Sequence, residues 1–161
     1  MKRIFKRALF SVCFATTSVL CMAQYTIYPV PHKAVSEKVN LQLTPTVNAV
    51  VESGIDNYTI ERLKEVVTIE NGIAITFSKK AKPGVTNIYL GINGSKGAAA
   101  KMVAKLGLST DVFAKVDKYD RHIVSIAPSA KGVGDIVIVG EHTNAVFYGL
   151  ATLEQILEQK A

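Results

Sequence analysis

The sequence has 161 residues, of which 19 are lysine or arginine and 13 are aspartate or glutamate, so its formal net charge is +6. Four of the basic residues lie among the first seven, and the first 23 residues contain no acid. The remaining chain is therefore almost neutral, with 15 basic residues against 13 acidic ones. It has no run of five like charges, which argues against nucleic acid or an anionic membrane as a partner.

The first 23 residues have the three parts of a secretory signal peptide. A basic segment ends at Arg7, an apolar run covers 8–20, and small residues precede a cut after Ala23. The apolar run is too short to cross a bilayer, which needs about 20 residues. We therefore expect a bacterial-type leader and export to the periplasm, the cell surface or the medium, with no membrane attachment after cleavage. A lipid anchor on Cys21 is the alternative, and the bulky Leu20 before it argues against one.

Cleavage after Ala23 would leave one domain, residues 24–161. Both cysteines, Cys13 and Cys21, would be lost with the leader, so this domain must fold without a disulfide bond and depend on its core. Its length suits one ordinary domain. It is too short for a (β/α)₈ barrel, which needs about 250 residues.

The first third of this domain predicts three short strands and a helix. β-Branched and aromatic residues indicate strands over 25–28, 39–43 and 47–51, and prolines interrupt the region. Asp56 then has the position of an N-cap residue. The apolar face of the helix that follows is formed by Ile60, Leu63, Val66 and Val67.

The middle of the domain predicts two strands and a second helix. After an Asn-Gly turn, one strand covers 73–77, and another covers 87–92. Ser95 is placed to cap a helix over 97–106. Gly107 is expected to end this helix, because glycine tolerates the left-handed conformation.

The last third predicts a helical turn over 109–114, strands over 122–127 and 136–140, and a final helix over 144–159. The expected order is β-β-β-α-β-β-α-β-β-α. Crossover helices between strands would make some central strands parallel. We therefore predict an α+β fold, close to α/β, with a single mixed sheet and about three helices packed mainly on one face.

The loop LGINGSKGAAAKM is the most suggestive candidate for a ligand site. It runs from a predicted strand through Gly91, Gly94 and Gly97 into a predicted helix, with Lys96 among them. A phosphate could bind at such a helix N-terminus. The phosphate-binding motif, however, requires Gly-Lys followed by Ser or Thr, and a glycine follows Lys96 here. We therefore interpret the loop as a glycine-rich turn.

Histidines give little support for a metal site. His32, His122 and His142 lie in separate segments, and no cysteine accompanies them in the domain. Asp120 and Arg121 directly precede His122, and this group predicts a small polar cluster with one ion pair. We expect the histidines to have structural roles.

Neither a nucleophile nor a carboxylate pair stands out. The sequence has no Gly-x-Ser-x-Gly motif and no two adjacent acids. Glu61 and Glu65 are four residues apart on one predicted helix, as are Glu154 and Glu158 on another, and both pairs lie off the apolar faces. We expect them on solvated surfaces. No catalytic, cofactor-binding or metal-binding residue is predicted.

Two segments nevertheless resemble a known accessory domain. IYPVPHK (27–33) is similar to its Tyr-Pro-x-Pro opening, and DIVIVGEHTNAVFYGLATLEQIL (135–157) is similar to its closing strand and helix. This domain is the N-terminal one of bacterial β-N-acetylhexosaminidases and hyaluronidase-like enzymes of glycoside hydrolase families 84 and 20. The matching residues of the closing segment are Gly140, Phe147, Tyr148, Gly149, Leu150, Thr152, Leu153, Gln155 and Leu157. Ala145 stands where many members have glycine.

The resemblance implies a mixed-sheet domain without catalytic residues, which precedes a (β/α)₈ catalytic barrel. In family 84 an adjacent Asp-Asp pair of the barrel does the chemistry, and this chain has no such pair. The implied function is that of a non-catalytic N-terminal domain, present as a fragment of an exported β-N-acetylglucosaminidase or hyaluronidase-like enzyme and packed against the barrel in cis. The alternative is a stand-alone exported binding module for a glycan or a protein, although the chain contains no Trp.

Overall fold

The computed structural model describes residues 26–35, 42–69, 71–114, 120–129 and 133–159. The expected signal peptide over 1–23 and both cysteines lie outside the described residues. Within the described ranges, no helix is long and apolar enough to cross a bilayer.

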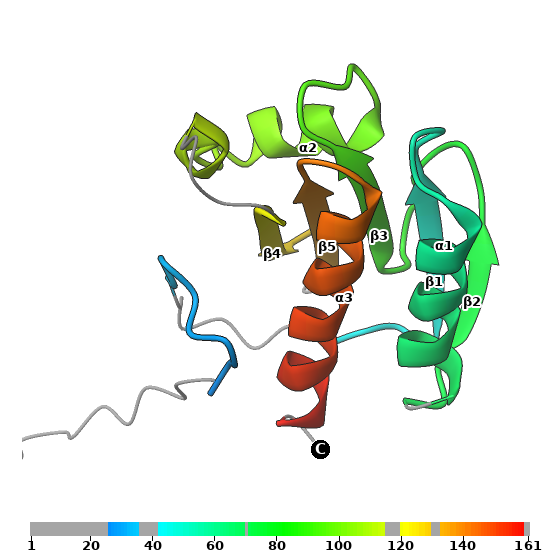
Figure 1. Ribbon diagram of the computed structural model, residues 1–161. Coiled ribbons are helices and arrows are strands. Elements are labelled where there is room, and N and C mark those ends of the chain that lie inside the picture. Colours follow the sequence, from blue (N-terminus) through cyan, green and yellow to red (C-terminus); the bar gives the residue numbers. More distant parts are fainter. Residues whose placement is uncertain (1–25, 36–41, 70, 115–119, 130–132, 160–161) are drawn as a thin grey trace, which may run out of the picture.

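A five-stranded sheet in the order β2-β1-β3-β5-β4 forms the centre of the domain (Figure 1). The strands are β1 (Thr46–Val51), β2 (Ala74–Phe77), β3 (Asn87–Ile92), β4 (His122–Pro128) and β5 (Gly134–Gly140). Four of them run parallel, and β4 is an antiparallel edge strand beside β5. The prediction of an α+β fold with a single mixed sheet is confirmed.

Three α-helices cover the two faces of this sheet. They are α1 (Asn57–Lys64), continued by the π-helical turn η1 (Glu65–Ile69), then α2 (Ala98–Lys105), followed by the 3-10 turn η2 (Asp111–Ala114), and α3 (Thr143–Glu158). Helices α1 and α3 lie on one face and α2 on the other (Figure 1). The pleat of β1 separates the two cores, because Val47 and Ala49 point toward α1 and α3 while Val50 points toward α2.

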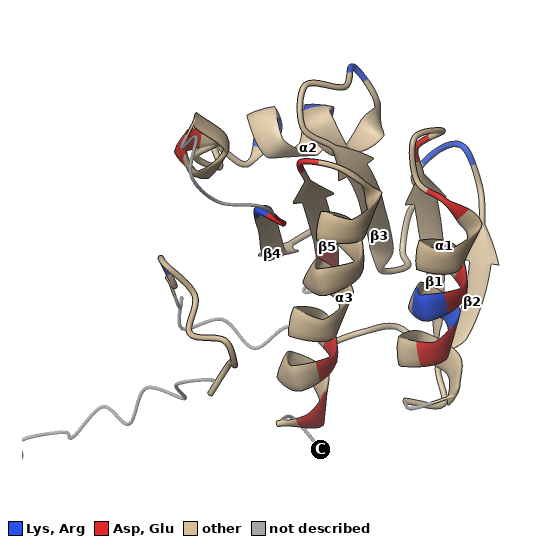
Figure 2. Ribbon diagram, viewed as in Figure 1, with Lys and Arg blue, Asp and Glu red and all other residues tan. Residues whose placement is uncertain are grey.

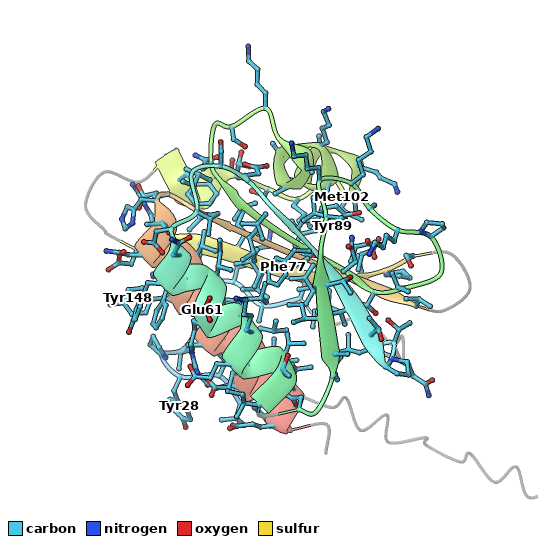
Figure 3. All side chains as sticks on the ribbon, turned by 90° about the vertical axis from the view of Figure 1, so that its right-hand side faces the viewer. Tyr28, Glu61, Phe77, Tyr89, Met102 and Tyr148 are labelled. Atoms are coloured by element: carbon cyan, nitrogen blue, oxygen red, sulfur yellow. The ribbon has the colours of Figure 1, made fainter. Side chains whose placement is uncertain are left out.

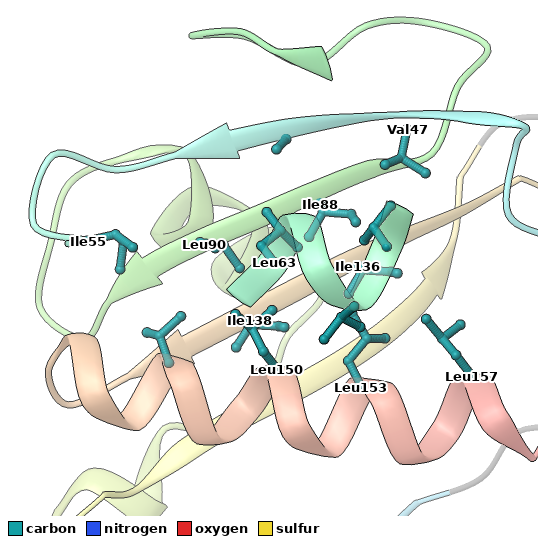
Figure 4. Packing of buried hydrophobic residues seen from close by; sticks show 14 residues of the cluster. Val47, Ile55, Leu63, Ile88, Leu90, Ile136, Ile138, Leu150, Leu153 and Leu157 are labelled. Carbon is teal, nitrogen blue, oxygen red and sulfur yellow. The ribbon is translucent and has the colours of Figure 1, made fainter. Parts of the chain in front are cut away.

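The larger core lies between the sheet and the α1–α3 pair (Figure 4). Leu150 and Leu153 of α3 are completely buried in this core, together with Ile136 and Ile138 of β5. Strand β5 is buried along its whole length, in agreement with the apolar sequence of its residues 136–140. The smaller core joins α2 to the opposite face through Val50, Tyr89, Ala99, Met102, Val103, Val137 and Val139.

Most predicted elements are confirmed to within two residues at each end, including every strand from β1 onward. The N-cap of α1 is confirmed as well, since the Thr59 amide donates to Asp56 Oδ1 at 2.8 Å. Gly107 has φ 62° and follows the end of α2, as expected.

The prediction of a strand over 25–28 is wrong for the described residues of that range, because the Tyr28 amide bonds to the side chain of Gln155 in α3 and the Thr26 amide to that of its C-cap Gln159, and neither pairs with a neighbouring strand. Most of the strand expected over 39–43 lies outside the described residues, and Gln42 forms an isolated parallel bridge with Val133.

Candidate functional site

The glycine-rich loop leads into the N-terminus of α2, and a carboxylate of the chain itself lies there. The Ala99 amide donates to Glu52 Oε1 at 3.0 Å, and α2 receives no side-chain cap from its own N-cap residue, Gly97. Ser95, the predicted cap, instead accepts a hydrogen bond from the Gly97 amide at 3.4 Å. A Cβ on Gly97 would lie 2.2 Å from Glu52 Oε1. Glycine is therefore required here to admit the Glu52 side chain, which takes the place where a phosphate would bind.

Two of the three histidines meet at the start of α3, around Asp120. His142 is the N-cap of this helix, and its Nδ1 accepts from the Ala145 amide at 3.4 Å. Its Nε2 lies 3.6 Å from Asp120 Oδ1. His122 Nδ1 lies 3.0 Å from the Asp120 carbonyl oxygen, and the described residues contain no group of three potential metal ligands. The contacts of both histidines are structural ones, at a helix cap and at the start of β4.

The ion pair predicted beside His122 is formed by Arg121, but its partner Glu141 comes from a distant part of the sequence. Arg121 pairs with Glu141 and not with Asp120, and the Arg121 side chain is only 13% exposed. The hydrogen bond from Arg121 lowers the pKa of the Glu141 carboxyl below its usual range. Because β4 and β5 are antiparallel with His122 opposite Gly140, their register brings the two residues together. The pair lies at the end of the sheet where β4 begins and β5 ends, directly before α3.

A shallow groove of about 650 Å³ runs between α1 and α3 on the outer surface. Tyr58 stacks on Phe147 with ring centroids 5.2 Å apart, and Tyr148 meets Phe147 edge-on at 6.0 Å. Tyr58 is 73% exposed and Tyr148 49% exposed, so both rings present apolar surface to solvent. We call these three residues the aromatic cluster, and Figure 3 shows Tyr148 and Glu61 on the outer side of the two helices.

The carboxylates of α1, its continuation η1 and α3 differ in their exposure to solvent. Glu61 and Glu65 are well exposed, as expected, and each pairs with a basic residue of its own helical region. Glu154 differs from the prediction of a solvated face, because its side chain is only 21% exposed and pairs with Arg62 of α1. The pair links the two helices, and sequence spacing within α3 alone could not show it.

Two glutamines at the C-terminal end of α3, Gln155 within the helix and its C-cap Gln159, hold the segment 26–35 by its backbone. The Tyr28 amide donates to Gln155 Oε1 and Gln155 Nε2 donates to the Tyr28 carbonyl, both at 2.8 Å. Gln159 makes the same pair of bonds with Thr26, at 2.7 and 2.8 Å. Residues four apart on a helix and two apart on an extended chain are both separated by about 6 Å, so the two pairs match in spacing. We call this arrangement the glutamine clasp.

Comparison with known proteins identifies the domain. The family model described as glycosyl hydrolase family 20, domain 2, matches residues 24–161. The chain belongs to this family. The solved structure of CpGH84D is 32% identical, with a TM-score of 0.74 over 86% of this chain. Together they make this chain an accessory domain of family 20 and 84 hexosaminidases.

Other comparisons add little to this assignment. The chain spans 22% of CpGH84D, which is thus a much longer protein. Another solved structure, described as that of a GH138 enzyme targeting pectin rhamnogalacturonan II, is 19% identical, with a TM-score of 0.46 over 71% of this chain and 14% of its own. That likeness is too low to bear on function. A search of curated proteins found no match.

The two segments that resemble this domain-2 family have a physical explanation in the structure. In the closing segment, a Cβ on Gly149 would lie 2.5 Å from Ile138 Cγ2, and one on Gly140 would lie 2.6 Å from the Val146 amide nitrogen. Both glycines let α3 approach β5 closely. The opening segment contacts the closing one through the glutamine clasp, where Gln155 binds Tyr28. The opening and closing segments are therefore in direct contact with each other in the folded domain.

Proposed function

We propose that residues 24–161 form the non-catalytic accessory domain of an exported β-N-acetylglucosaminidase or hyaluronidase-like enzyme, and that this domain packs against a (β/α)₈ catalytic domain in cis. The family match over these residues carries the proposal. The greater length of CpGH84D supports it, because a domain of this type forms about a fifth of that protein. The parent enzyme would hydrolyse N-acetylglucosaminides, and the chemistry would belong to the catalytic domain.

The aromatic cluster is the surface that we propose for this packing. Large apolar side chains that are exposed together are favoured at interfaces between domains and proteins. Here Tyr58 and Phe147 line the α1–α3 groove, Tyr148 contacts Phe147, and Ile69, which also lines the groove, is 77% exposed. Arg62, which also lines the groove, pairs with Glu154 and so links α1 to α3. The aromatic cluster therefore lies on two helices that are linked to each other, and a docking surface needs such a stable support.

The proposal is tested first by activity and by the gene. The 161-residue chain alone is expected to release no chromophore from a chromogenic N-acetyl-β-glucosaminide. Reading frames beyond the codon for Ala161 are expected to encode the catalytic domain. Hydrolysis by the chain alone, or a natural stop codon with no barrel encoded nearby, would contradict the proposal. Export is tested by sequencing the N-terminus of the protein recovered outside the cytoplasm, which should begin at Gln24.

The docking surface is tested in the longer protein that contains both domains. Replacing Tyr58 and Tyr148 together by alanine should separate the thermal unfolding of the two domains, since exposed contact area between them is lost. The matched control is Val35→Ala, at a position that is 76% exposed and outside the α1–α3 groove. Unchanged, coupled unfolding of the double variant would show that the domains contact each other elsewhere.

A further inference from the structure

Lysines gather around a second groove, on the face of the sheet that carries α2. This groove has a volume of about 450 Å³, and it is lined by Lys79, Lys80, Ala81, Tyr89, Gly97, Ala98, Lys101, Met102 and Lys105. Four of the nine lining residues are lysines and none is acidic. We call it the lysine groove. Its walls come from two parts of the chain, the loop after β2 and helix α2, and its floor comes from β3.

The charge of this groove contrasts with the opposite face of the sheet. Helix α2 and the loop after β2 carry lysines and no acid, whereas α1 and α3 across the sheet carry acidic residues, together with the basic Arg62 and Lys64 of α1 (Figure 2). Among the described residues, none of the four groove lysines forms an ion pair with a carboxylate. All four are exposed. A local excess of positive charge therefore remains, although residues 24–161 as a whole are almost neutral.

The loop wall of the groove is fixed by a buried polar row. Asn48, Asn87 and Asp135 lie side by side on three neighbouring strands, joined by bonds of 2.9 Å between Asn48 Nδ2 and Asn87 Oδ1 and 3.2 Å between Asn87 Nδ2 and Asp135 Oδ1. From this row, Asn48 Nδ2 donates to the Lys80 carbonyl at 3.1 Å. The Lys82 amide donates to Asn87 Oδ1 at 2.8 Å. The backbone that carries Lys80 is thus held in place, which lowers the entropic cost of using it to bind a ligand.

The other wall and the floor are also built from ordered elements. Lys101 and Lys105 are one helical turn apart on α2, so both reach the same side of the groove. Met102 and Tyr89 lie next to each other beneath α2 (Figure 3), where both belong to the smaller core. Burial raises the pKa of the Tyr89 phenol, and the charge of Asp135 adds to this effect. The phenol is therefore protonated at neutral pH and can donate a hydrogen bond.

From this arrangement we infer that the lysine groove binds an anionic polysaccharide, a chain of sugars that carry carboxylate groups. The charge complementarity comes from Lys79, Lys80, Lys101 and Lys105. The choice of a carbohydrate over an acidic protein rests on the proposed function, because a carbohydrate-active enzyme meets glycans in its work. The site is separate from the aromatic cluster, which lies across the sheet. An accessory domain that bound such a chain would keep the parent enzyme close to acidic glycans.

The test is a titration of the ¹⁵N-labelled 161-residue chain with an oligogalacturonide, followed by NMR. The methyl ester of the same oligosaccharide is the control ligand, since it has the same length without the charges. We expect amide shifts confined to 79–82 and 98–105, with a Kd below about 1 mM at low salt. Binding should weaken as the salt concentration rises, because the groove lysines are exposed and their charges are screened.

Two protein variants locate the site. The double substitution K101E/K105E replaces two attractive charges by repulsive ones and should weaken binding by about tenfold or more. The control variant K33E/K64E makes the same change of charge outside the groove and should keep the original affinity. Thermal melts check that both variants are folded.

The inference is overturned if the methyl ester binds as well as the acid, if K101E/K105E binds normally, or if no shift occurs at about 10 mM ligand. Equal binding of a poly-glutamate of the same length would also overturn it, because a protein surface would then be as good an occupant. None of these outcomes bears on the packing of the domain against a catalytic barrel. Conversely, if the domain is shown not to pack against a barrel, the result of this titration is unaffected.

Discussion

The packing of α3 on the sheet can be tested by the substitution Leu153→Ala. Leu153 is completely buried and lies in the core formed by α1, α3 and the sheet. Removal of a buried leucine side chain costs about 2–5 kcal/mol, because apolar contacts are lost and a cavity remains. We expect a value near the middle of this range, about 3–4 kcal/mol. The core around Leu153 includes residues of β3 and β5, and the pairing of these strands in the sheet limits how far they can move into the space.

The measurement is thermal and urea unfolding of the 161-residue chain. A loss of about 3 kcal/mol should lower the Tm by roughly 10 °C in a domain of this size. The control is Ile69→Ala, which removes a similar apolar side chain at a position that is 77% exposed and should change stability by no more than about 0.5 kcal/mol. A Leu153→Ala variant that melted with the wild type, or with the control, would show that α3 is not docked as described.

Two further predictions concern polar contacts that the sequence did not indicate. Glu52→Ala removes the carboxylate that caps α2 and should lower the free energy of unfolding by about 1 kcal/mol, as loss of a helix cap does. Glu52→Gln keeps an acceptor for the Ala99 amide and should lower it less. Urea unfolding of the two variants measures the difference. The Glu141 pKa is lowered in the folded state, so its contribution to stability is complete above the ordinary glutamate value of 4.5 and disappears as the pH falls through the folded pKa. Glu141→Gln should therefore lower the Tm at neutral pH and have progressively less effect below about pH 4.5, in melts recorded from pH 3 to 7. A constant difference in Tm across that range would mean that the ionised carboxylate does not supply the stabilisation.

Local patterns predicted most of the fold, because they depend on residues that are close in sequence. The apolar run of β5 and the 3.6-residue spacing of Leu150, Leu153 and Leu157 each indicate one element without knowledge of the rest. The N-cap Asp56 was also predictable, since it bonds to an amide only three residues away. The strand expected over 25–28 was wrong for the opposite reason. Its residues favour an extended conformation, but whether an extended segment joins a sheet depends on tertiary structure, which the local sequence does not show.

The contacts that shape the candidate site join residues far apart in sequence, and no single-segment pattern reveals them. Glu52 caps a helix that begins 46 residues later, at Ala98, and Arg121 finds Glu141 only through the register of β4 and β5. The lysine groove likewise depends on a crossover that brings α2 beside the loop after β2. Neither stretch of lysines is long enough to stand out in the sequence as a basic segment.

The family resemblance contained information about tertiary structure that the local patterns lack, and the glutamine clasp explains how. The opening and closing segments resembled the same family separately, although they lie more than a hundred residues apart. In the structure the two segments contact each other, with Gln155 bound to the backbone of Tyr28, and the pair Gln159–Thr26 just beyond their ends extends this contact. A glutamine can satisfy a backbone amide and carbonyl together because its side chain carries both a donor and an acceptor. A motif shared within a family can therefore report a long-range contact that composition and periodicity do not contain.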